Sequence, residues 1–189
     1  PPPDCGDSRT QREPGNAGDW KRAADEFPKW ANPPLPGLVV RRARERGENI
    51  VAMLSLETIG YYTDATGSQH YPFPFSPFYP DTANFIAFVG NLASRELVQA
   101  CLASFRSRAA FPAEGIAVPG WMGGVHWSDH WSFWREGYPA IMVTDTALYR
   151  YEHYHAQTDT PDKIDYERLA RVVTGLAEVI RDLAGRDAE

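Results

Sequence analysis

Residues 50–56 read IVAMLSL, a nearly continuous apolar run that only Ser55 interrupts and that Glu57 ends. A run of this length without polar alternation is typical of a strand that is buried on both faces. Such strands belong to parallel sheets, because the crossover helices of a parallel sheet cover both of its faces. The run therefore predicts a β-strand in a parallel α/β sheet.

Helical and strand patterns alternate on both sides of this run. Residues 38–46 are typical of a short helix that stops at Gly47. Further strands are expected at residues 84–89, 116–118 and 139–144, and further helices at residues 92–105, at residues 129–136 and from about residue 165. This alternation predicts an α/β fold, with a mostly parallel sheet and helices on both of its faces.

The first 36 residues differ from the rest of the chain. They contain eight prolines and no sustained apolar period, so we expect residues 1–36 to form an irregular proline-rich arm. Residues 37–189 are then expected to form the folded domain. The sequence starts at Pro1 without a methionine or a leader, which favours a processed chain, a cloned one or a fragment of something longer.

Composition argues against several classes of protein. The chain of 189 residues has a formal net charge of −6, so it offers no general field for a nucleic-acid backbone. No apolar run approaches the roughly 20 residues that a membrane-spanning helix needs, so we expect a soluble protein. Its two cysteines, Cys5 and Cys101, make neither a disulfide framework nor a thiolate metal site, and the compartment stays unassigned.

Polar side chains follow the predicted strands at three places. Glu57 ends the first strand, the Ser128-Asp129-His130 turn precedes a predicted helix, and a loop with His153 and His155 follows the last strand. Ligands of open α/β sheets bind beyond the carboxyl ends of the strands, so these side chains are candidates for function. A carboxylate and an imidazole from adjacent strand ends would supply two of the three protein ligands of an open zinc site.

Each candidate also has a purely structural interpretation. Glu57 could simply begin the loop after its strand, and His155 could be a hydrogen-bonded loop residue. Ser128 could be the N-cap of the following helix, with Asp129 and His130 in its first turn. The sequence contains no Gly-x-Ser-x-Gly turn and no phosphate-binding loop, so a serine hydrolase and a nucleotide-binding protein are disfavoured.

Three stretches together are similar to one family of enzymes. They are VAMLSLETIGY at residues 51–61, SDHWSFWREGYPA at residues 128–140, and YH at residues 154–155 followed by DTPDKIDY at residues 159–166. In composition, order and spacing they resemble the co-catalytic zinc aminopeptidases, the metallopeptidase family numbered twenty-eight. The resemblance extends from about Gly37 to the C-terminus and implies a zinc-exopeptidase-like fold.

The resemblance implies roles for several residues. Glu57 would be a ligand of one zinc ion and His155 a ligand of the other, while Asp129 and His130 would lie beside the metals at the substrate end. Tyr61, Tyr62 and the loop of residues 72–79 would line a pocket for an apolar side chain. The implied reaction is zinc-assisted hydrolysis that removes N-terminal residues from peptides with a free amino terminus.

The sequence departs from the family pattern at its N-terminal side. The family also uses an upstream His-x-Asp motif, a bridging aspartate and a Glu-Glu pair, but no histidine occurs before His70. Asp25 and Glu26 stand about where the pair would fall. We therefore predict the C-terminal part of a catalytic domain, with its N-terminal part missing or replaced, an incomplete active site, and zinc binding that is weak or lost.

Two other functional interpretations stay open. The chain could be a non-catalytic binding domain of the same fold, or an inactive fragment, so the sequence alone does not decide whether it is an enzyme. Missing N-terminal strands would leave an open sheet edge, through which the chain could associate with itself.

Overall fold

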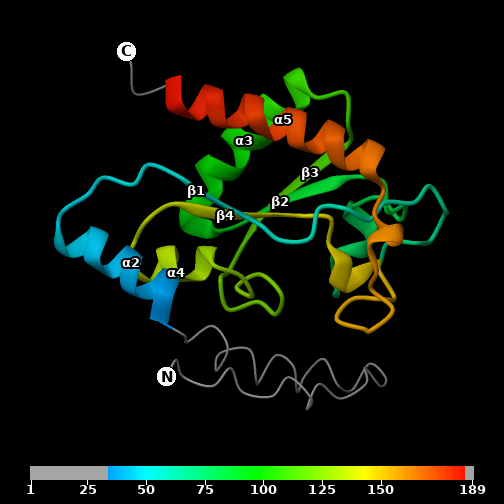
Figure 1. The fold of residues 1–189 in the computed structure, drawn as a ribbon, viewed down its shortest axis with the longest axis horizontal. Helices are drawn as coiled ribbons and strands as arrows, with labels where there is room; N and C mark the ends of the chain where they lie inside the picture. The colour runs from blue at the N-terminus through cyan, green and yellow to red at the C-terminus, as the bar shows by residue number, and fades with distance from the viewer. Residues whose placement is uncertain (1–33, 186–189) are drawn as a thin grey trace, which may run out of the picture.

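The computed structural model describes residues 34–185, which form a four-stranded sheet with helices on both faces (Figure 1). The predicted α/β class with helices on both faces is confirmed. Residues 1–33 of the predicted arm, including Asp25 and Glu26, lie outside the described residues. Helix α2 begins at Pro34, inside the range that was predicted as an irregular arm.

The helices and strands follow the predicted order. Their bounds are α2 (Pro34–Glu45), β1 (Met53–Leu56), β2 (Ile86–Asn91), α3 (Arg95–Arg108), β3 (Ala113–Val118), α4 (His130–Arg135), β4 (Ala140–Thr144) and α5 (Tyr166–Gly185). Short 3-10 turns are η2 (Ser76–Phe78), η3 (Leu92–Ser94), η4 (Ala147–Tyr149) and η5 (Pro161–Lys163). None of the helices in the described part of the chain is long and apolar enough to cross a membrane.

The strand order is β1-β4-β2-β3. Strand β1 pairs with β4 in parallel, and β2 pairs with β3 in parallel, whereas β2 and β4 are antiparallel. The sheet is therefore mostly parallel, and it consists of two parallel pairs joined by one antiparallel ladder. Because β1 and β4 are parallel neighbours, the residues that follow them emerge at the same edge of the sheet.

Strand β1 differs from its prediction. It begins only at Met53, and it is not buried on both faces, since Leu56 is 55% exposed. Among the described residues β1 pairs only with β4, and helix α3 packs against β2, β3 and β4 instead. The end of β1 is therefore left partly uncovered, although its sequence is as apolar as that of a central strand.

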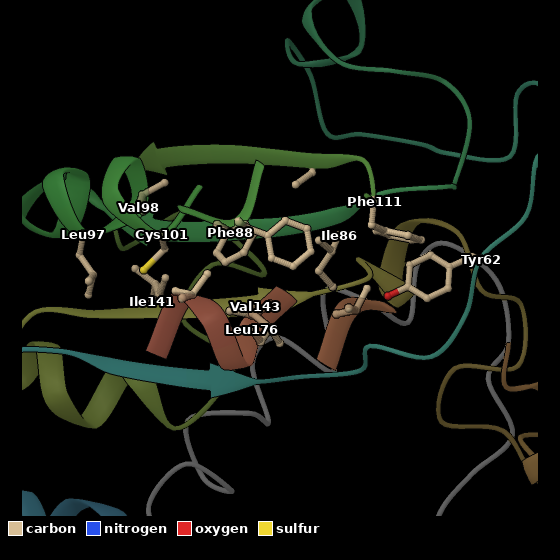
Figure 2. Close-up of a cluster of buried hydrophobic side chains, with 14 residues drawn as sticks. Tyr62, Ile86, Phe88, Leu97, Val98, Cys101, Phe111, Ile141, Val143 and Leu176 are labelled. Carbon is tan, nitrogen blue, oxygen red and sulfur yellow. The ribbon is translucent and has the colours of Figure 1, made fainter. Parts of the chain in front are cut away.

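The main hydrophobic core lies between the sheet and helices α3 and α5. Figure 2 shows Phe88, Ile141 and Val143 of the strands facing Cys101 and Leu176 of these helices, and all five side chains are buried. Alternate residues of the same strands point to the opposite face of the sheet. There a second cluster forms around Phe85, Ala87, Val89, Val118, Val125 and Met142, and this face carries the candidate site.

Candidate active site

Glu57 follows β1 directly and continues its pairing with β4. Its backbone N–H donates to Val143 O at 2.9 Å, and its carboxylate Oε2 accepts a hydrogen bond of 2.9 Å from Ser128 Oγ. The oxygen Oγ of Ser128 also lies 2.7 Å from Ser55 Oγ. This chain of hydrogen bonds fixes the partly buried Glu57 carboxylate at the edge of the sheet.

Ser128 is therefore not a helix cap. Helix α4 begins at His130, its N-cap residue is Asp129, and Asp129 makes no side-chain capping hydrogen bond. The hydroxyl group of Ser128 cannot serve the helix N-terminus because it is directed to Glu57. The capping interpretation of this turn is wrong, and Ser128 belongs to the candidate site.

Asp145 joins the ends of the two parallel strands. Its backbone N–H donates to Thr58 O at 2.8 Å, and its Oδ2 accepts hydrogen bonds from the N–H groups of Gly60 at 2.9 Å and Tyr61 at 2.8 Å. Thr58 adopts a left-handed conformation with φ of 48°, which turns the chain sharply after Glu57. Asp145 thus holds the segment that positions Glu57.

Asp145 is only 1% exposed, so its ionisation is perturbed. Burial raises the pKa of the Asp145 carboxyl, while the Tyr61 N–H and the positive charge of Arg150 oppose that rise. Sequence reasoning missed this residue. Its signal was an aspartate immediately after the apolar strand of residues 140–144, at the same sheet edge as Glu57.

His155 lies in the loop between β4 and α5, which leaves the sheet at the edge where Glu57 stands (Figure 1). It is exposed, has a left-handed φ of 57°, and its ring meets the Tyr154 ring edge-on at 4.2 Å. Burial, followed by the charges of Glu57 and Asp145, raises the pKa of Tyr154 to about 12. The residue next to His155 is therefore close to Glu57, and the approach of His155 itself to a shared metal stays a prediction.

The other two candidates have separate surroundings. Asp129 is exposed, whereas His130 is fully buried, with Nε2 2.6 Å from Val125 O and its ring 4.5 Å from that of Trp134. Burial lowers the pKa of His130 to about 4, so its imidazole is neutral at pH 7. His130 does not line the cavity described below, but it holds the carbonyl of Val125, which does. Their roles beside a metal stay predictions.

A cavity of about 140 Å³ opens beside Glu57 on this face of the sheet. Its walls are mainly apolar and come from the strands, the segment of residues 71–79 and the segment of residues 122–127. Pro72, Phe75 and Tyr79 line it, as predicted for the loop of residues 72–79. Tyr61 and Tyr62 do not, and that expectation is wrong.

The two tyrosines are held elsewhere by neighbouring aromatic rings. Tyr62 packs edge-on against Phe111 at 5.0 Å in the core on the opposite face of the sheet. Tyr61 stacks on Tyr151 at 4.6 Å. The hydrogen bonds that the Gly60 and Tyr61 N–H groups donate to the Asp145 carboxylate set the direction in which both side chains leave this segment.

Residues 39–180 match the family model described as Peptidase family M28. The chain belongs to peptidase family M28. A protein of Escherichia coli (strain K12), described as uncharacterized protein YfbL, is 37% identical over 159 residues. That alignment covers 84% of this chain and 49% of YfbL, so the chain spans about half the length of this curated relative.

Solved structures of the Legionella pneumophila LapA aminopeptidase share the fold of this M28 chain. One has a TM-score of 0.54 at 18% identity and covers 79% of this chain and 34% of LapA. A second has a TM-score of 0.55 at 17% identity and covers 85% of this chain and 36% of LapA. At this identity the likeness extends to the fold alone.

The donor atoms of the M28 chain fit zinc in kind but not in number. A carboxylate oxygen and an imidazole nitrogen are ordinary zinc ligands, and Glu57 and His155 offer one of each. Within residues 34–185, however, no group of three or more His, Cys, Asp or Glu side chains could hold a metal ion. The described part of the chain therefore supplies at most two of the ligands that a stable site requires.

Arg150 supports the wall of the cavity in this M28 chain. It is 8% exposed, and it donates from Nε to Gln69 Oε1 at 2.7 Å and from Nη1 to Phe85 O at 3.0 Å. Its guanidinium also lies over the Phe85 ring at 4.6 Å. Both Gln69 and Phe85 line the cavity, so a buried cation behind the wall fixes its shape.

Proposed function

We propose that this chain carries part of the active site of a zinc-dependent aminopeptidase-type hydrolase, which removes N-terminal residues from peptides. The observation that supports this most strongly is the position of Glu57. Ser128 fixes its carboxylate in the lining of an apolar cavity, and the same lining includes Tyr154, the neighbour of His155. Membership of family M28 supports the same chemistry.

In this proposal Glu57 and His155 are the two metal ligands that the described residues contribute. Bound zinc would polarise the scissile carbonyl and acidify a water molecule. Ser128 orients Glu57, and Asp145 holds the turn that follows it. The cavity receives the side chain of the substrate's N-terminal residue and excludes water around it. We assign no general base, since Asp25 and Glu26 lie outside the described residues.

Zinc titration of metal-free protein by calorimetry tests this proposal. We expect weak but measurable binding, which His155→Ala and Glu57→Gln each weaken by at least tenfold, because each removes one ligand. His153→Ala is the matched control. His153 lies in the same loop, but its Nδ1 is 2.9 Å from Thr158 Oγ1, and its loss should leave zinc affinity unchanged.

A non-catalytic binding domain is the second candidate. The lack of a three-ligand group within residues 34–185 favours it. The same titration separates the two functions, because a binding domain should show no zinc binding that depends on His155. Absence of such binding, together with a cooperative unfolding transition, would replace the enzyme proposal by the binding domain.

A further inference from the structure

A second carboxylate, that of Glu114, lines the cavity at the end opposite to Glu57. Ladder pairing extends from Leu56 and Val143 by one residue and brings Glu57 beside Thr144. Thr144 pairs with Ala87 on β2, and Ala87 pairs with Glu114 on β3. The four residues therefore form one row across the sheet, and all of them line the cavity.

This row sets the distance between the two carboxylates. Neighbouring strands lie about 4.8 Å apart, so three steps place the Cα atoms of Glu57 and Glu114 about 14 Å apart. The walls between them are apolar and include Val89, Ile116 and Met142. No Lys, Arg or His side chain of the described residues lines the cavity. The cavity thus has a carboxylate near each end of this row, mainly apolar walls between them, and no cationic side chain from the described residues in its lining.

Glu114 has one charged neighbour, Arg106, whose guanidinium also binds a backbone carbonyl. Arg106 Nη2 lies 3.3 Å from Glu114 Oε2, but the same guanidinium donates to Ala113 O at 2.6 Å and 3.1 Å. The side chains of Arg106 and Glu114 are 51% and 30% exposed, so their ion pair contributes little. Glu114 therefore keeps acceptor capacity toward the cavity.

The charge of Glu114 acts on two tyrosines of the cavity wall. Burial is the main reason why the pKa values of Tyr71 and Tyr79 are raised. The charge of Arg150 opposes the rise at Tyr71, whereas Glu114 raises both pKa values further. Both phenols line the cavity, as Glu114 does. Glu114 therefore brings a negative charge to the far end of the cavity, where it can pair with a cation of a ligand.

We propose that the cavity selects an N-terminal lysine, with its ammonium group at Glu114 and its methylene chain along the apolar walls. This inference rests on the proposed function and names its substrate class. An extended lysine side chain spans about 6 Å from Cα to Nζ, and a hydrogen bond from Nζ adds about 3 Å, so a residue whose α-carbon lies at the Glu57 end can reach the Glu114 carboxylate along a row of about 14 Å between Cα atoms. A leucine side chain would fill the near part of the cavity and leave Glu114 without a cation.

NMR chemical shifts of the methionine methyl groups can measure how tightly the cavity binds a lysine derivative and an uncharged analogue. Met122 and Met142 line the cavity and Met53 does not, so the three methionines provide two reporters and one internal reference. The probes are lysinamide and norleucinamide, which differ by the terminal ammonium, titrated in the presence of zinc chloride. We expect lysinamide to bind about tenfold more tightly, because a charge-assisted hydrogen bond is added in a partly enclosed site.

Glu114→Gln should abolish this difference by weakening the binding of lysinamide. Glu167→Gln is the matched control, since it also removes a carboxylate paired with an arginine, Arg171, but on an exposed face of α5. Norleucinamide binding as tightly as lysinamide, or a lysinamide preference that survives Glu114→Gln, would overturn the assignment of Glu114 alone. Failure of both probes to shift Met122 and Met142 would overturn the proposed function as well.

Discussion

Ser128 Oγ donates a hydrogen bond of 2.9 Å to Glu57 Oε2 and so joins the segment before α4 to the end of β1. Ser55, two residues before Glu57 on the same face of β1, lies 2.7 Å from the same hydroxyl. Because the single hydroxyl hydrogen of Ser128 is donated to the Glu57 carboxylate, Ser55 is the donor in the hydrogen bond between the two serines. Glu57 is therefore oriented before any metal binds.

Ser128→Ala should weaken zinc binding without unfolding the protein. Hydrogen bonds that orient metal ligands typically change affinity by about 10- to 100-fold, and we expect the lower end, because Glu57 keeps its backbone position. Calorimetric titration measures the change, with Ser107→Ala on the exposed face of α3 as the control. Unchanged affinity in Ser128→Ala would mean that Glu57 is not a ligand or does not depend on this bond.

His130 should make stability depend on pH. The folded state holds it neutral, with a pKa of about 4 against 6.5 for a free imidazole. Between these values the unfolded chain binds a proton that the folded chain does not, so the free energy of unfolding falls as the pH drops. The loss that His130 causes should approach about 3 kcal/mol below pH 4.

Urea unfolding at pH 5 and pH 7.5 measures this effect against His130→Gln, which can keep a donor for Val125 O. The variant should lose less stability than the parent protein between the two pH values. Equal losses would show that His130 is protonated in the folded state, and that its burial is incomplete.

Arg150 should be essential for stability. Arg150→Ala would leave Gln69 Oε1 with one donor fewer and Phe85 O without its 3.0 Å partner, and would remove the cation near the buried Asp145. Removing one member of such a buried network costs about 3–5 kcal/mol. Denaturant unfolding measures the change. Arg171→Ala, which breaks an exposed i,i+4 pair with Glu167, should change stability by only about 0.5 kcal/mol.

The positions of single strands and helices could be predicted from the sequence, whereas contacts between distant segments could not. The end of the first strand just before Glu57 and the last helix, expected from about residue 165, appear where they were predicted. The antiparallel pairing of β2 with β4 was missed, because the burial pattern of a strand carries no information on its direction. The expectation that Leu56 is buried was wrong for a similar reason. How well a strand is covered depends on the strands and helices that pack beside it, which its own sequence does not show.

The candidate site shows the same division. Glu57 could be named as a candidate because it ends a strand, but its hydrogen bond from Ser128 depends on how two distant loops meet. The family resemblance placed Tyr61 and Tyr62 at the cavity. Their actual directions depend on hydrogen bonds from their segment to Asp145, 84 and 85 positions away in sequence.

Gly175 allows α5 to pack closely on α3. A Cβ atom added there would lie 2.4 Å from Phe105 Cε2 and 2.6 Å from Ala109 Cβ, so Gly175→Ala forces the helices apart. Alanine favours a helix over glycine by about 1 kcal/mol, but overpacking a core typically costs about 1–3 kcal/mol. We expect a net loss of stability in thermal and urea unfolding.

Gly185→Ala is the control for this prediction. An added Cβ there meets nothing within 4 Å, so this change should not destabilise the protein. Adding Phe105→Leu to Gly175→Ala should then cost less than the sum of the two single changes, because the smaller side chain makes room for the methyl group. A Gly175→Ala variant as stable as the parent protein would mean that α3 and α5 pack less closely than the structure has them.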